Sequence, residues 1–100
     1  MRRKNSKYRR QLERLPDEVK SILEALATDE YLLENYYSQY MGWRLEISIK
    51  KVNFILLKEC GQIFVSKIIE GEEVHIHPKD GSDEESKPEV IAKIINAQVA

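Results

Sequence analysis

The sequence predicts an α+β fold, with two N-terminal helices, a three- or four-stranded antiparallel meander and one C-terminal helix. Residues 43–77 are the most apolar, most β-branched and most regularly alternating part of the chain. Residues 15–40 and 88–99 instead carry apolar side chains three and four positions apart, the spacing of amphipathic helices. Because helices and strands are segregated along the chain, an antiparallel sheet is favoured over a parallel α/β sheet.

The first 14 residues are predicted to form a basic N-terminal arm, followed by a single α+β domain at residues 15–100. The arm holds seven lysines and arginines and one glutamate, whereas the other 86 residues hold nine basic and sixteen acidic ones. Such an uneven distribution of charge is typical of a basic arm on an acidic body.

Two helices are predicted before the sheet. Pro16 followed by two acidic residues is a strong helix start, because proline suits the first turn and acids favour the positive end of the helix dipole. Thr28 or Asp29 is the candidate N-cap of a second helix, which Gly42 would end. One long helix that bends near Thr28 is the alternative, and two helices are favoured. The apolar positions of the second helix are Leu32, Leu33, Tyr36, Tyr37 and Tyr40, of which Tyr36 and Tyr40 are predicted to pack on the sheet.

The strands follow from alternation and from turn residues. Leu45, Ile47 and Ile49 alternate with polar residues, the pattern of a strand with one buried face. Residues 54–57 are all apolar, as in a central strand covered on both faces. Residues 50–53 form either a turn or a bend within one long strand, which leaves three or four strands open.

A hairpin turn is predicted at Cys60-Gly61, where two residues separate two apolar runs. This turn fixes the register and sorts the side chains onto two faces, which a slip of one residue would exchange. The predicted cross-strand pairs are Lys58–Ile63, Leu57–Phe64, Leu56–Val65 and Ile55–Ser66. The predicted core face carries Phe54, Leu56, Ile63, Val65, Ile69, Val74 and Ile76. The second face carries Ile55, Leu57, Phe64, Ile68, His75 and His77.

The C-terminal part is predicted to be a solvated loop and then a helix. Residues 78–87 are almost entirely polar or charged. Ser86 is a candidate N-cap, with Pro88 and Glu89 in the first helical turn. The apolar stripe of this helix is Val90, Ile91, Ile94, Ile95 and Val99.

Several classes of protein are disfavoured by the sequence. One cysteine cannot form an intramolecular disulfide, no apolar run approaches the ~18 residues of a membrane span, and no apolar segment follows the basic N-terminus as in a signal peptide. A cytoplasmic protein without membrane contact is therefore expected.

No catalytic, metal or cofactor site is expected. His75 and His77 would share a face of a strand, but a metal site would need Cys60 as a third ligand. Cys60 as a nucleophile would need one of these histidines as its base. Asp80 begins half of a calcium loop, but Ile91 stands where the twelfth-position acid is required.

The leading functional hypothesis is a small non-catalytic interaction module that regulates or adapts a protein partner, with a homodimer as one form of this contact. Its basis is the apolar second face of the sheet and a cluster of aromatic residues, which are enriched at interface hot spots. The predicted interface residues are Tyr37, Trp43, Ile55, Leu57, Phe64 and Ile68.

The alternative hypothesis is a nucleic-acid-associated protein whose basic arm binds the phosphate backbone. Such binding would release counterions and weaken steeply with salt. A helix-turn-helix mode is disfavoured, because Asp29, Glu30 and Glu34 would repel phosphates. The residues predicted for this role are Arg2, Arg3, Lys4, Lys7, Arg9 and Arg10.

Overall fold

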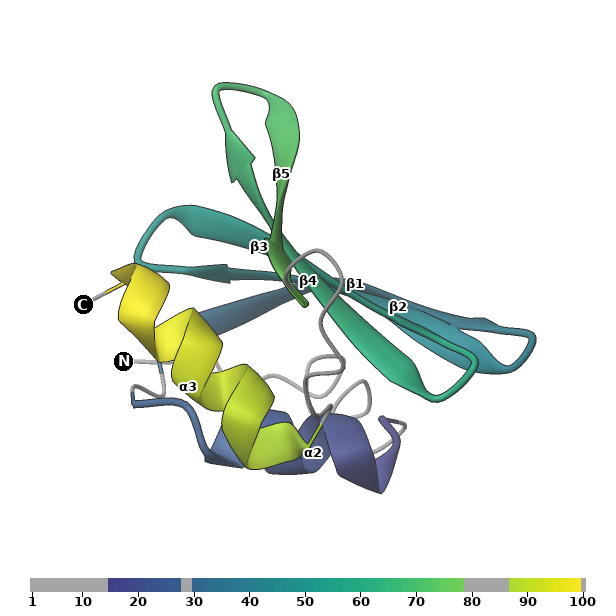
Figure 1. Ribbon diagram of the computed structural model, residues 1–100. Coiled ribbons are helices and arrows are strands. Elements are labelled where there is room, and N and C mark those ends of the chain that lie inside the picture. The colour runs from purple at the N-terminus through teal and green to yellow at the C-terminus, as the bar shows by residue number, and fades with distance from the viewer. Residues whose placement is uncertain (1–14, 28–29, 79–86, 100) are drawn as a thin grey trace.

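The computed structural model describes residues 15–27, 30–78 and 87–99 (Figure 1). The α+β class and the antiparallel sheet are confirmed, but the sheet has five strands rather than three or four, and one helix precedes it in the described residues. The elements are α2 (Asp17–Glu24), β1 (Tyr31–Gln39), β2 (Gly42–Ile49), β3 (Val52–Glu59), β4 (Gln62–Ile69), β5 (Glu72–His77) and α3 (Pro88–Val99).

The five strands form a meander in which each strand pairs with the next one along the chain. Both described helices lie on the same face of the twisted sheet (Figure 1). We call this the inner face and the opposite one the outer face. The core fills the space between the helices and the inner face. Its buried side chains are Leu15, Val19, Ile22, Leu23, Leu26, Trp43, Leu45, Ile47, Ile49, Phe54, Leu56, Ile63, Val65, Ile91, Ala92 and Ile95.

The turn at Cys60-Gly61 lies where the sequence predicts it. Both residues have positive φ, 49° and 84°, as in the two-residue turns whose twist matches that of paired strands. Strand β3 pairs with β4 so that Leu57 faces Phe64 and Leu56 faces Val65. The predicted register is therefore confirmed at all four pairs.

A second two-residue turn, at Lys50-Lys51, decides the question that the sequence left open. These lysines have φ of 51° and 69°, and they join β2 to β3 as separate strands. Positive φ brings the Cβ atom of an L-residue too close to its own carbonyl oxygen, so this turn is strained in a way that a glycine would not be.

Replacing Lys51 by glycine is expected to raise the free energy of unfolding by about 0.5 to 1 kcal/mol, because glycine adopts positive φ without this steric cost. Urea unfolding followed by circular dichroism measures the change. The matched control is Asn53→Gly, at an exposed position of β3, which should lower stability. An unchanged or lower midpoint for Lys51→Gly, at a constant m-value, would contradict the expectation.

The prediction of a second helix is wrong, because residues 31–39 form β1. The register against β2 shifts between Leu33 and Asn35, so that Glu34 is the extra residue of a β-bulge. The residues that pack on the core are Tyr31, Leu33 and Tyr36. The bulge changes their spacing from two to three, and a spacing of three is also typical of a helix face.

The end of the predicted helix is also reassigned. Tyr36 packs against the core as expected, but Tyr40 is 94% exposed in the β1–β2 turn. Gly42, which was expected to end a helix, begins β2 and pairs with Glu59. A Cβ atom on Gly42 would lie 1.8 Å from the backbone oxygen of Lys58, so only glycine fits this crossing of β2 and β3.

Helix α2 begins directly after Pro16, as predicted, and Lys20 donates its backbone N–H to the oxygen of Pro16 at 3.0 Å. Glu18 connects this helix to the sheet. Its Oε1 accepts hydrogen bonds from Trp43 Nε1 at 3.1 Å and from Lys58 Nζ at 2.8 Å. These bonds hold the first turn of α2 against β2 and β3.

Helix α3 starts at Pro88 with Glu89 in its first turn, as predicted, while residues 79–86 of the predicted loop, with the Ser86 cap, lie outside the described residues. Asn96 of α3 also completes the C-terminal end of α2. Its Oδ1 accepts from the Ala27 N–H at 2.8 Å, and its Nδ2 donates to the Ala25 oxygen at 3.4 Å. The two helices are thus joined to each other as well as to the sheet.

The hairpin of β4 and β5 extends beyond the helices (Figure 1). Ile69 and Val74, predicted to be core residues, are therefore 44% and 42% exposed. Their side chains belong to the inner face, since Val74 faces Lys67 and Lys67 faces Phe54. What the sequence could not show is that neither α2 nor α3 covers this end of the sheet.

Candidate functional site

The outer face carries an apolar stripe at its centre, made by residues that alternate with the core. Ile55 and Leu57 come from β3, and Phe64 and Ile68 come from β4. All four side chains are half-buried, and Leu57 lies directly opposite Phe64. Successive side chains of a strand point to opposite faces of the sheet. Leu56 and Val65 point into the core, so the residues next to them in the chain point to the outer face. Four of the predicted interface residues are thus brought together.

A polar group lies beside the apolar stripe, on β1 and β2. Glu46 accepts hydrogen bonds from Asn35 Nδ2 at 2.9 Å and from Arg44 Nε at 3.0 Å. The bond from Asn35, together with the Arg44 charge and hydrogen bond, lowers the pKa of Glu46 below its ordinary value, although partial burial opposes this. Glu46 is therefore a carboxylate at neutral pH, held in place on the outer face.

A hollow of about 430 Å³ opens where this polar group meets the apolar stripe. The bulge in β1 places Glu34 beside Asn35 at its rim, across from Glu46 of β2. Ile55 and Ile68, from the apolar stripe, form another part of its wall. The described residues that line it are Glu34, Asn35, Glu46, Ile47, Asn53, Phe54, Ile55 and Ile68.

Two further apolar side chains are exposed on β1. Tyr37 is 49% exposed and faces Arg44 across the β1–β2 ladder, and Leu32 is 55% exposed and faces Ser48. Both lie on the outer face, because Tyr36 and Leu33 next to them pack on the core. Tyr37 therefore joins the predicted interface residues on this face.

Trp43 does not belong to this surface. It is 4% exposed, lies in the core and donates its indole N–H to Glu18. The prediction that it contributes to an interface is corrected, since a residue between the sheet and α2 has no surface to offer. The position of Trp43 near several tyrosines in the sequence suggested a surface cluster. In β2, however, side chains alternate between the two faces, with Trp43 on the inner face and Arg44 on the outer face.

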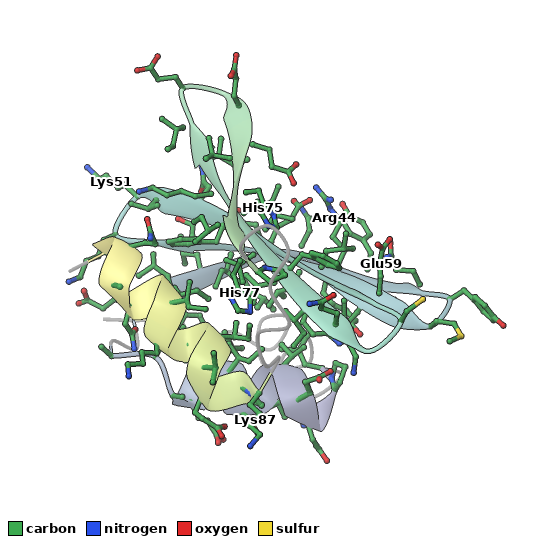
Figure 2. All side chains as sticks on the ribbon, in the orientation of Figure 1. Arg44, Lys51, Glu59, His75, His77 and Lys87 are labelled. Carbon is green, nitrogen blue, oxygen red and sulfur yellow. The ribbon has the colours of Figure 1, made fainter. Side chains whose placement is uncertain are left out.

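The two histidines lie on opposite faces, contrary to the prediction that they share one. The β4–β5 register shifts between Val65 and Ser66, which makes Ile76 the extra residue opposite them. His77 is therefore 3% exposed on the inner face, whereas His75 lies on the outer face against the ring of Phe64 (Figure 2). The bulge removes the geometry on which a shared metal ion would depend.

The other residues considered as metal ligands, as a nucleophile or as nucleic-acid contacts do not form a common site in the described part of the chain. His75 Nε2 is hydrogen-bonded to the backbone oxygen of Pro78. Cys60 is exposed in the β3–β4 turn. Within the described ranges no three His, Cys, Asp or Glu residues converge as a metal site. Asp80 and the residues of the basic arm, Arg2, Arg3, Lys4, Lys7, Arg9 and Arg10, lie outside the described residues.

Replacing Asn35 by alanine is expected to raise the pKa of Glu46 toward the ordinary glutamate value, because the largest cause of its depression is lost. A depressed folded-state pKa stabilises the fold above that ordinary value, and this contribution is lost as pH falls through the folded pKa. The pH titration of the Glu46 carboxyl carbon by NMR measures the shift. Ser48→Ala, on the same face of β2, is the control, and an unmoved pKa in Asn35→Ala would contradict the assignment.

No pattern in the sequence indicated the residues that make the hollow, above all Glu34 and Asn35. They were assigned to a helix, so their position beside Glu46 could not be foreseen. The available signal was the content of tyrosine in residues 31–40, since aromatic residues favour strands.

Comparison of the chain with protein-family models, with curated proteins and with solved structures gives no match. In the described part of the chain, neither helix has the length and apolar character needed to cross a membrane. The outer face itself is therefore the basis on which a function can be proposed.

Proposed function

We propose that this protein is a small, non-catalytic interaction module, which binds a protein partner through the outer face and thereby regulates or adapts it. The observation that carries this proposal is the apolar stripe on the face that neither α2 nor α3 covers. When a partner removes such half-buried apolar side chains from water, the complex is stabilised by about 25 cal/mol per Å² of apolar surface buried.

The arrangement of the outer face resembles the usual anatomy of a protein interface, an apolar centre with a polar rim. Leu57 and Phe64 form the centre, and Tyr37 lies farther out on β1. Arg44 and Glu46 lie between them as a paired, partly exposed group. Partly exposed ion pairs of this kind contribute little affinity but influence which partner is accepted.

Photochemical crosslinking tests the proposal without a known partner. Benzoylphenylalanine replaces Phe64 on the outer face or, as a matched control, Ile69 on the inner face of the projecting hairpin. In an extract of the source cells we expect one discrete adduct from position 64 and none from position 69. An adduct of twice the chain's mass would identify a second copy of this chain as the partner.

Competition shows whether the adduct depends on the apolar stripe. Unlabelled wild-type protein should abolish the adduct, Val74→Ser should do so equally well, and Leu57→Ser should compete poorly. Circular dichroism verifies that both competitors are folded. If Leu57→Ser competes as well as wild type, or if positions 64 and 69 give the same adducts, the outer face is not the binding surface.

A nucleic-acid-associated role is the alternative proposal, supported by the concentration of seven basic residues in residues 1–14. It requires binding to single- or double-stranded nucleic acid that weakens steeply with salt and is lost when residues 1–14 are deleted. Retention of binding after deletion, or no binding at low salt, would exclude this role. We further propose that the protein acts in the cytoplasm.

A further inference from the structure

The hollow on the outer face combines negative charge with an apolar wall. Among the described residues that line it, Glu34 and Glu46 are acidic and none is basic. Glu34 from the β1 bulge and Glu46 from β2 both line the hollow, so that both acidic residues border the same space. Two like charges near one another favour the approach of a cation.

Within the part of the chain that the structure describes, the negative charge of the hollow is only partly compensated. Arg44 Nε lies 3.0 Å from Glu46 Oε2, and both side chains are partly exposed, at 33% and 27%. Hydrogen bonding from Asn35 lowers the pKa of Glu46, so it stays ionised at neutral pH. Glu34 adds a second negative charge at the exposed rim.

The apolar wall suits the stem of a long basic side chain. Ile55 and Ile68 line the hollow together with the two glutamates and are also members of the apolar stripe. Arginine and lysine side chains place their methylene groups on apolar surface while the charged end reaches polar groups. Asn35 and Asn53, also in the lining, add amide oxygens that accept hydrogen bonds from such an end.

We propose that the hollow receives an arginine or lysine side chain from a polypeptide partner, whose adjacent apolar residues lie on the apolar stripe. This inference rests on the proposed function and adds the chemistry of the partner. A polypeptide segment is favoured over a small molecule because the hollow is open and continuous with Ile55 and Ile68 of the stripe. Small-molecule sites instead enclose most of the surface of their ligand.

A random dodecapeptide phage library, selected on the immobilised full chain, identifies which segments the outer face accepts. We expect the enriched peptides to contain an arginine or lysine next to leucine, isoleucine or phenylalanine. Selection on Glu34→Gln/Glu46→Gln should lose the preference for the basic residue and keep that for apolar ones.

Fluorescence anisotropy with one enriched peptide then gives dissociation constants. We expect Glu34→Gln to weaken binding by roughly threefold and the double variant by roughly tenfold, as for partly exposed ion pairs. Raising the salt concentration tenfold should weaken binding to wild type but not to the double variant. Glu72→Gln is the matched control, since this exposed glutamate of β5 does not line the hollow, and it should bind as wild type does.

The outcomes separate this inference from the function on which it rests. Enriched peptides without basic residues, which Leu57→Ser still weakens, would overturn the inference and leave the binding face in place. Peptides that are insensitive to both Leu57→Ser and Glu34→Gln, or no enrichment at all, would overturn both.

Discussion

Replacing Leu56 by alanine is expected to lower the free energy of unfolding by about 3 kcal/mol, within a range of about 2 to 5 kcal/mol. Leu56 is 0% exposed and lies on the inner face opposite Val65, in the middle of the core. Its truncation removes buried methyl groups and leaves a cavity that the paired strands cannot close. Since a domain of this size is stable by only about 5 to 15 kcal/mol, the loss is a large share of the total.

The same replacement at Leu57 is expected to cost only about 1 kcal/mol, because this leucine is half-buried on the outer face. Binding should instead be affected, with weaker crosslinking from position 64. Urea unfolding of both variants measures the difference between two adjacent leucines on opposite faces. Equal losses of stability would mean that the outer face is covered in the folded protein, which would contradict the assignment of the two faces.

Replacing Gly42 by alanine is expected to lower the free energy of unfolding by about 2 to 3 kcal/mol. The new Cβ atom would lie 1.8 Å from the Lys58 oxygen, which belongs to the backbone of β3 and cannot rotate away. The first residues of β2 would have to separate from Glu59 to relieve this contact.

Gly71→Ala is the matched control for the Gly42 variant. Gly71 has a positive φ of 82°, but a Cβ atom there has no neighbour within 4 Å. Gly71→Ala should therefore lower the free energy of unfolding only through backbone strain, by about 1 kcal/mol. Thermal and urea unfolding compare the two, and a Gly42→Ala variant as stable as Gly71→Ala would show that β2 and β3 tolerate a wider spacing.

The sequence was most informative where strands alternate without interruption. In β2, Leu45, Ile47 and Ile49 are all buried, as their period of two predicts. The turn at Cys60-Gly61 fixed the β3–β4 register correctly, because a two-residue turn leaves only one pairing. Local chemistry decides both features, so they can be deduced from a few neighbouring residues.

Two β-bulges account for the largest errors in the fold predicted from the sequence. In β1, the extra residue Glu34 separates Leu33 from Tyr36 by three positions, which imitates a helix. In β5, the extra residue Ile76 sends His77 into the core and leaves His75 outside. A bulge is stabilised by pairing with the neighbouring strand, and therefore no pattern within a single strand reveals it.

The candidate site could be predicted only in its apolar part. Ile55, Leu57, Phe64 and Ile68 follow from the register of one hairpin. The hollow needs Glu34 of β1 to meet Glu46 of β2 and Asn53 of β3, which requires both the true strand count and the bulge.

The bonds between Asn96 and the end of α2 have a consequence for synthesis of the chain, since they join residues 69 and 71 positions apart. The hairpins of the meander close over short loops and can form as soon as each strand leaves the ribosome. Ile91 and Ile95, both fully buried, emerge after all five strands. A nascent chain that stops before α3 therefore exposes part of its inner face to chaperones and proteases. A premature stop codon at that point should destabilise the protein as the loss of core residues does.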